Sequence, residues 1–167
     1  MNGNTEVTQQ LERLQLLVDE LEIRRVITDY ASLIDAREYD QLHSLFAPDI
    51  VVDYHNGRTQ VVGADNVVDY IVENTRHLAW QHHNVSPYGI DLSGDRATAQ
   101  VYLLSHQMLT DSPGEVLMMA ATYDLELTRG EQGWQILHMT HEIKVANYLP
   151  ITTTPAGGAH VPPAVRH

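Results

Sequence analysis

LAWQHHNVSPYGIDLSGDRATAQVYLLSHQMLT, residues 78–110, is the stretch that decides the fold. Apolar and polar side chains alternate over residues 78–92 and again over residues 97–110, and the intervening SGDR is rich in turn-forming residues. The same period of two continues over residues 116–128 and 133–146, which DSPGE and RGEQG separate from their neighbours. We therefore predict four long antiparallel strands joined by turns.

The chain before these strands is predicted to be mainly helical. Leu and Val recur every three or four residues between Leu11 and Ile34, as one long helix or as two helices joined near Glu22. A shorter helical segment, residues 38–46, ends before Pro48, and residues 64–76 form another helix. Between them, IVVDY and TQVVG flank Asn-Gly, which predicts a hairpin. Helices placed before a strand meander indicate an α+β fold, with the helices on one face of the sheet and a pocket on its concave side.

Composition excludes several classes of function. The net charge of −12 and the single lysine, Lys144, argue against nucleic-acid binding. No apolar run approaches the length of a membrane-spanning helix, which is about 20 residues. The polar N-terminus does not resemble a signal peptide, and the absence of cysteine excludes disulfides and thiolate chemistry. We predict a soluble, cytoplasmic protein.

The length of 167 residues predicts one domain, residues 1–149, in which residues 1–20 are a helical extension. Residues 150–167 are rich in Pro, Gly and Ala and show little periodicity. This segment is either a disordered tail or an arm over the pocket or a neighbouring subunit.

Three polar residues are the candidate catalytic groups. Asp35 closes the long helical segment, His82 lies in the first long strand, and His106 lies in the second. A carboxylate that fixes one imidazole, with a second imidazole across a cavity, can transfer protons without a metal or a nucleophile. Because His82 and His83 are adjacent on a strand, only one of them faces the pocket, and composition does not choose between them.

Together these features resemble the SnoaL-like branch of the nuclear transport factor 2-like superfamily. The segments that carry the resemblance are LIDAREYDQLHSLFAPDIVVDY, WQHHNVS and LLSHQ. Scytalone dehydratases are the closest likeness, with hexachlorocyclohexane dehydrochlorinases and bile-acid 7α-dehydratases as relatives. The resemblance implies a cone-like α+β barrel, in which a strongly curved antiparallel sheet and N-terminal helices enclose a pocket. The tail PAGGAHVPP is similar to the dehydrochlorinase arm, which implies a homo-oligomer, with a trimer favoured over a dimer.

The resemblance also implies roles for individual residues. Asp35 matches the dyad carboxylate, His82 the dyad histidine, His106 the second histidine, and Tyr54 a phenol that binds a carbonyl or water. Ile34 stands where scytalone dehydratases carry a second Tyr, so the substrate contacts differ from theirs. Met119 and Tyr123 are expected to line the substrate pocket.

The predicted function is a cofactor-independent lyase that removes water, or another leaving group, from a small cyclic, largely apolar substrate. An isomerase or polyketide cyclase could use the same dyad, and a binding module of this fold would need no catalysis. A metal site built from His82, His83, His106, His138 and Glu142 is the less favoured alternative, because no regular ligand spacing is present. His138 and His141 are three residues apart on a strand and are expected on opposite faces.

Overall fold

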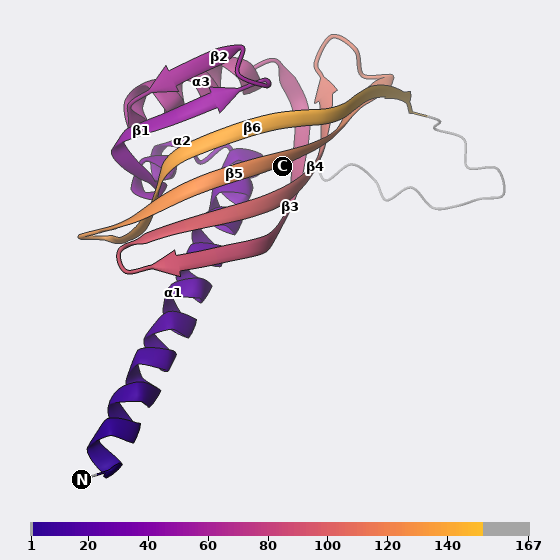
Figure 1. Ribbon diagram of the computed structural model, residues 1–167. Coiled ribbons are helices and arrows are strands. Elements are labelled where there is room, and N and C mark those ends of the chain that lie inside the picture. The colour runs from indigo at the N-terminus through magenta and orange to yellow at the C-terminus, as the bar shows by residue number, and fades with distance from the viewer. Residues whose placement is uncertain (1, 152–167) are drawn as a thin grey trace, which may run out of the picture.

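The computed structural model describes residues 2–151, with side chains from residue 4 on, so the predicted tail lies mostly outside the described residues. The elements follow in the order α1 (Asn2–Ala36), α2 (Tyr39–Leu42), the 3-10 helix η1 (His43–Leu45), β1 (Phe46–Tyr54), β2 (Thr59–Val62), α3 (Ala64–Thr75), β3 (Leu78–Ser93), β4 (Arg96–Leu109), β5 (Glu115–Gly130) and β6 (Gly133–Pro150). Figure 1 shows one curved, open sheet with the helices gathered on its concave side. The predicted α+β class is confirmed.

The six strands lie in the order β2-β1-β6-β5-β4-β3. The meander from β3 to β6 is antiparallel throughout, as its alternating sequence predicts, and each strand bonds to the next along the chain. The exception is the parallel pair of β1 and β6. The direction of β6 is set by its antiparallel pairing with β5, and β1 runs in that same direction beside it. The prediction of an antiparallel sheet was therefore wrong for the pair of β1 and β6.

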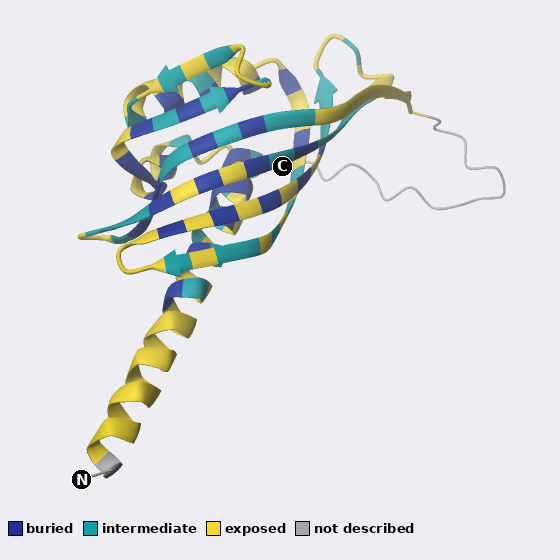
Figure 2. Ribbon diagram, in the orientation of Figure 1, coloured by how far each residue is buried: buried dark blue, intermediate teal, exposed yellow. Residues whose placement is uncertain are grey.

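Buried and exposed residues alternate along the strands (Figure 2), so that one face of the sheet is buried. On β4, for example, Ala97, Ala99, Val101 and Leu103 are all less than 5% exposed, whereas the residues between them are exposed. The C-terminal half of α1 packs against β3 and β6, and α3 packs against β1. The concave side of the sheet therefore holds both the apolar core and any enclosed cavity.

β1 begins earlier than the sequence predicts. Helical structure ends at Leu45, and Phe46 already pairs with Ile136 of β6. Pro48 lies in the irregular stretch between the paired positions Phe46 and Val51, where its missing N–H costs no ladder hydrogen bond. The predicted helix to residue 46 was therefore one residue too long, and Pro48 belongs to the strand.

The connection from β1 to β2 is longer than the predicted two-residue turn. It spans residues 55–58, with positive φ angles at His55 (54°), Asn56 (62°) and Gly57 (76°). The Asn56 side chain also bonds to β6, since its Oδ1 accepts from the Ile143 N–H at 2.7 Å. The turn is thus tied to the strand that lies next to β1.

α1 is a single helix whose N-terminal part projects from the body of the protein (Figure 1). All side chains of residues 4–18 are exposed, and Asp19 is the first buried one, at 3%. Asp19 bonds to Arg129 at 2.5 Å and accepts a 3.4 Å hydrogen bond from Trp134 Nε1, which lowers the pKa of its carboxyl group. This contact anchors the helix where it enters the fold.

No helix within the described residues is long and apolar enough to cross a membrane.

Candidate active site

The end of α1 places Asp35 beside β3. Arg37 adopts a left-handed conformation (φ 60°), and the helix ends in a Schellman motif. In this motif the Arg37 N–H donates to the Ile34 carbonyl (3.1 Å) and the Glu38 N–H donates to the Leu33 carbonyl (2.9 Å). The Gln81 amide on β3 donates a further bond to the Ile34 carbonyl at 2.6 Å. The helix end is therefore fixed to β3, the strand that carries His82 and His83.

Asp35 and His83 form a hydrogen-bonded acid–base pair. One carboxylate oxygen of Asp35 accepts from the His83 backbone N–H at 2.8 Å, and the other accepts from Nδ1 of the ring at 2.6 Å. An ionised carboxylate only accepts, so Nδ1 carries the proton and Nε2 of the neutral ring is left as a base. The side chains are 22% and 11% exposed, which keeps the pair largely shielded from water.

The prediction that His82 pairs with Asp35 was wrong. Consecutive residues of a strand point to opposite faces, and His83 faces the helix while His82 is exposed on the convex face. There its ring stacks on Trp80, with centroids 6.1 Å apart, and on His106, with centroids 6.3 Å apart.

His106 is also on the convex face, so its predicted position across the cavity was wrong. It is the cross-strand partner of His82, and such partners share a face of the sheet. The same register makes Ser105 the partner of His83 on the concave face. Ser105 in turn lies opposite Met119 on β5. His83, Ser105 and Met119 are therefore neighbours on three adjacent strands, and all three lie on the concave face.

A cavity of about 270 Å³ opens beside His83. The sequence-predicted residues Ile34, Tyr54, Met119 and Tyr123 all lie in its wall. Every large element contributes to the lining, which also includes Tyr30, His55, Tyr70, Ile71, Asn74, Thr75, His77, Leu103, Ser105, Gln107, Leu117 and His141. The wall is mainly aromatic and aliphatic and contains neither Lys nor Arg, so the cavity suits a neutral, largely apolar ligand.

Burial holds three polar groups of this wall, His141, Tyr54 and Tyr123, in their neutral forms. Burial, together with repulsion from His55 and His83, lowers the pKa of His141 to about 4. Burial likewise raises the pKa of the Tyr54 and Tyr123 phenols well above their ordinary value. At neutral pH these three side chains therefore offer hydrogen-bond donors and acceptors without adding charge.

Residue His141 is one that sequence reasoning did not single out for the pocket. It lies on β6, 8% exposed, with its ring centroid 5.3 Å from that of Tyr123. His138 lies on the other face of the same strand, as predicted, where its Nε2 is 2.9 Å from the Asp53 carboxylate. The His138 contact lowers the pKa of Asp53.

Among the described residues, no three His, Asp or Glu side chains are arranged to hold a metal ion.

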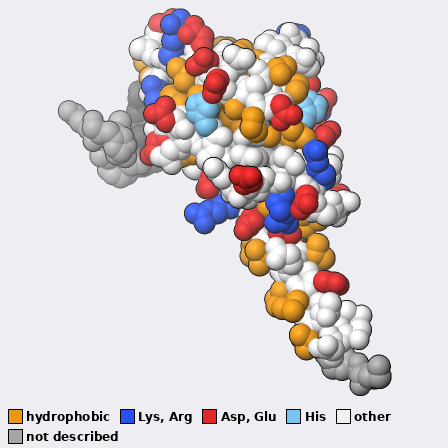
Figure 3. Space-filling view, turned by 90° about the vertical axis from the view of Figure 1, so that its left-hand side faces the viewer, with side chains coloured by type: hydrophobic (Ala, Val, Ile, Leu, Met, Phe, Trp, Pro, Cys, Tyr) orange, Lys and Arg blue, Asp and Glu red, His pale blue; other side chains and the backbone are white. Residues whose placement is uncertain are grey.

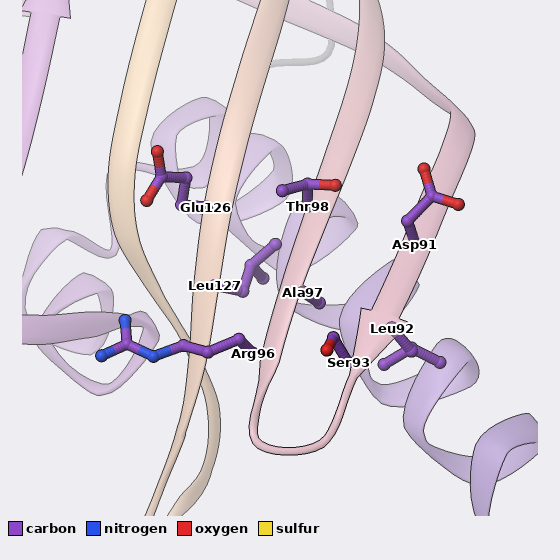
Figure 4. Close-up of a pocket in the computed structure, with 8 residues that line it drawn as sticks. All are labelled: Asp91, Leu92, Ser93, Arg96, Ala97, Thr98, Glu126 and Leu127. Atoms are coloured by element: carbon purple, nitrogen blue, oxygen red, sulfur yellow. The ribbon is translucent and has the colours of Figure 1, made fainter.

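A second depression of about 410 Å³ lies near the turn between β3 and β4 (Figure 4). Its charged side chains are Asp91, Arg96 and Glu126, and no hydrogen bond or ion pair joins any two of them. It contains no histidine or tyrosine. This depression is larger than the cavity beside His83, but its lining residues include no histidine hydrogen-bonded to a carboxylate.

A signal for the correct histidine was present in the sequence. On β3, Asn84 and Ser86 are polar while Val85 is apolar, which assigns odd-numbered residues to the concave face. On β4, the polar residues Thr98 and Gln100 assign even-numbered residues to the convex face. The β3 pattern places His83 inward and His82 outward, and the β4 pattern places His106 outward.

Comparisons with known proteins agree with this architecture. A family model described as a SnoaL-like domain matches residues 15–140. Uncharacterised proteins of Mycobacterium tuberculosis and Mycobacterium bovis are 26% identical over 123 residues, covering 71% of this chain and 81% of theirs.

Solved structures share the fold at low identity. A hexachlorocyclohexane dehydrochlorinase from Novosphingobium barchaimii is 19% identical, with a TM-score of 0.72 over 92% of this chain and 99% of that one. A protein of Novosphingobium aromaticivorans, provisionally described as a scytalone dehydratase, is 19% identical, with a TM-score of 0.73 over 86% and 97%. An NTF2-like protein with a cystatin-like fold from the same organism is 22% identical, with a TM-score of 0.73 over 82% and 89%. At these identities the likeness establishes the fold alone.

Proposed function

Because the chain belongs to the SnoaL-like domain family, we propose that it is a cofactor-independent lyase in which Asp35 and His83 perform the proton transfer. The observation that carries this proposal is the Asp35–His83 pair, whose histidine lines the wall of an apolar cavity. A binding pocket needs no base held in one tautomer by a carboxylate, whereas proton abstraction does.

The reaction is an elimination beside a carbonyl group. His83 Nε2 removes the proton from the carbon next to the carbonyl, and the C–H electron pair forms the enolate. The enolate then expels the β leaving group, and the Nε2–H of the imidazolium protonates a departing hydroxide to give water. Asp35 stabilises the imidazolium between these steps, and the free base is restored at the end.

Other wall residues assist the same reaction in this proposal. The Tyr54 phenol is a neutral donor suited to the oxygen on which negative charge develops, and such a donor contributes about 3 kcal/mol. Ile34, Met119 and Tyr123 exclude water and contact the ring of the substrate. The relationship to a dehydrochlorinase and to a provisionally assigned dehydratase supports an elimination.

An isomerase or polyketide cyclase is the alternative, because either reaction starts with the same proton abstraction. The dyad alone favours neither outcome, since His83 returns its proton to a leaving group in one case and to carbon in the other.

We expect the wild-type protein to dehydrate a bicyclic β-hydroxy ketone, with β-hydroxytetralone as the probe. Loss of water gives an enone that tautomerises to a naphthol, whose fluorescence reports the product. The reaction is run in deuterated water, so that exchange at the carbon beside the carbonyl is followed by NMR in parallel. Naphthol formation supports the lyase, exchange without naphthol supports an isomerase or cyclase, and neither signal across a panel of such ketones contradicts the proposed catalysis.

We further propose that the protein is a homo-oligomer joined through the projecting part of α1. Val7, Leu11, Leu14, Val18 and Leu21 are 46–67% exposed and follow alternating steps of four and three residues, and Figure 3 shows apolar side chains along this helix. Such spacing fits a second helix of the same kind, as in a coiled coil. Most helical stability in proteins comes from packing an apolar face, so a second copy of the chain that covers this face would stabilise the projecting part of α1.

We therefore expect Leu14→Lys to lower the mass measured by sedimentation equilibrium to that of the monomer of 18.8 kDa. Gln9→Lys adds the same charge on the opposite face of the helix and should leave the oligomer intact. The mass of the wild-type protein distinguishes the favoured trimer from a dimer. A wild-type protein that is monomeric at high micromolar concentration would refute this assembly.

A further inference from the structure

A row of side chains that commonly bind metals crosses the convex face of the sheet. His82 on β3 pairs with His106 on β4, and His106 pairs with Met118 on β5. Directly paired residues of neighbouring antiparallel strands share one face of the sheet, with Cβ atoms about 4.5–5.5 Å apart. Two imidazoles and one thioether therefore lie next to each other on the face opposite the cavity.

The two imidazoles are spaced for a shared ion. Their ring centroids are 6.3 Å apart, and the ring planes are inclined by 25°. A metal lies about 2.0 Å from an imidazole nitrogen and roughly 3 Å from the centre of that ring, so two rings on one ion have centres up to about 6 Å apart. The torsion that turns an imidazole ring is broad, so both rings can present a nitrogen to such an ion while the strands stay in place.

These rings have no other polar partner. Among the described residues, no hydrogen bond or ion pair engages the ring of His82 or His106, whose ring contacts are aromatic. The rings of His55, His83 and His138, by contrast, each bond to an oxygen. His82 is exposed and His106 is half-buried, so solvent reaches both. Their ring nitrogens are thus available to an ion from solution.

Met118 decides which metal fits the row. Its thioether is a soft ligand, which favours Cu(I), and imidazole also suits copper. No carboxylate belongs to the row, so the oxygen ligands that Ca²⁺ and Mg²⁺ require are missing there. The net charge of −12 attracts cations to the protein in general.

We propose that His82, His106 and Met118 form a Cu(I) site, in which the two imidazoles are the principal ligands and the thioether is the third. Trp80 flanks this site, because its ring, 48% exposed, stacks on His82 with centroids 6.1 Å apart. The site is separate from the cavity, since His83 lies on the opposite face of β3. Copper binding therefore does not depend on the proposed lyase activity.

The test is a competition for Cu(I), kept in the cuprous state by ascorbate without oxygen, between the protein and the chelator bicinchoninate. The coloured chelate reports the metal that the protein leaves behind. We expect the wild-type protein, free of any affinity tag, to withdraw one Cu(I) per chain. His82→Ala and His106→Ala should each weaken binding by at least tenfold, because even a change beside a metal ligand costs roughly 10–100-fold. Met118→Leu keeps the size of the side chain and should weaken Cu(I) binding while leaving Zn²⁺ binding unchanged.

Two control variants should keep the wild-type affinity for Cu(I). Met119→Leu makes the same change as Met118→Leu, one residue further along β5 and on the concave face. His138→Ala removes a histidine from the convex face that lies on β6, away from the row. Failure of the wild-type protein to withdraw Cu(I), or unchanged affinity in His82→Ala, would overturn the site. Unchanged Cu(I) affinity in Met118→Leu, or an equal loss for Zn²⁺, would overturn the assignment to copper.

Trp80 provides a second and local measurement. The chain contains two tryptophans, and the other, Trp134, is 3% exposed and donates to Asp19 near the projecting part of α1. Cu(I) bound at the row should quench the fluorescence of Trp80. The Trp80→Phe variant should therefore lose the quenching while it still withdraws one Cu(I). Quenching that persists in Trp80→Phe would place the metal elsewhere and overturn the proposal.

Discussion

His83→Ala is expected to reduce turnover of the cyclic ketone by roughly 10²–10⁴-fold, the range that a general acid–base group contributes. The physical reason is the loss of the imidazole that Asp35 orients in the wall of the cavity. Substrate binding should change little, because the wall is mostly apolar. The measurement is kcat and KM for naphthol formation, with the loss expected in kcat.

Asp35→Asn is expected to cause a loss of similar size for a different reason. Asp35 accepts two hydrogen bonds, one from the His83 backbone and one from its Nδ1. Asparagine has only one acceptor oxygen, and its NH₂ group must face the other position. If the amide donates to Nδ1, the ring proton moves to Nε2, and the base no longer faces the substrate. An orienting carboxylate accounts for up to about 10⁴-fold in related arrangements.

His82→Ala is the matched control for both substitutions. It removes an adjacent, chemically identical side chain that lies on the convex face, so kcat should stay within about twofold of the wild-type value. Circular dichroism and thermal unfolding of each variant would show that the fold is retained. Full activity of His83→Ala, or loss of activity in His82→Ala with the fold intact, would contradict the assignment.

The pair His82 and His83 shows which step of sequence reasoning was weak. The strand itself was predictable, because alternation is a local property, and the predicted strand of residues 78–92 became Leu78–Ser93. The assignment by resemblance placed the histidine one residue too early. A shift of one residue moves a side chain to the other face of the sheet. The predicted His82 is therefore only one residue from the correct His83, but its side chain points to the opposite face. The polar residues Asn84 and Ser86 carried the information that decides the face.

Residues at the ends of elements were easier to place. Asp35 is the last residue but one of α1, and Tyr54 is the last residue of β1. Both lie where local helix and strand signals predict. His141 had no such signal. Its face depends on the register shift between β5 and β6 near Leu127, and its neighbour Tyr54 is brought close by the parallel pairing of β1 and β6. Both features depend on long-range contacts, which a local pattern does not encode.

The buried His141 is expected to make the stability of the fold depend on pH between about 6.5 and 4. In the unfolded chain this ring binds a proton near its ordinary pKa of 6.5, whereas in the folded protein its pKa is lowered to about 4. Between these values the unfolded state binds more protons, so acidification favours unfolding. The contribution is fully present above pH 6.5 and is lost as pH falls toward 4. A shift of this size corresponds to about 3 kcal/mol of unfolding free energy.

Urea unfolding at pH 7 and at pH 4.5 measures this loss. His141→Phe fills the site with an apolar ring that binds no proton, so its unfolding free energy should fall much less over the same interval. His138→Phe should retain the slope of the wild-type protein, because it leaves His141 in place. The lowered pKa values of Asp19 and Asp53 contribute below this window, where their stabilising ionised forms are lost as pH falls through their folded pKa. An equal slope in His141→Phe and wild type would mean that His141 is not held neutral in the folded state.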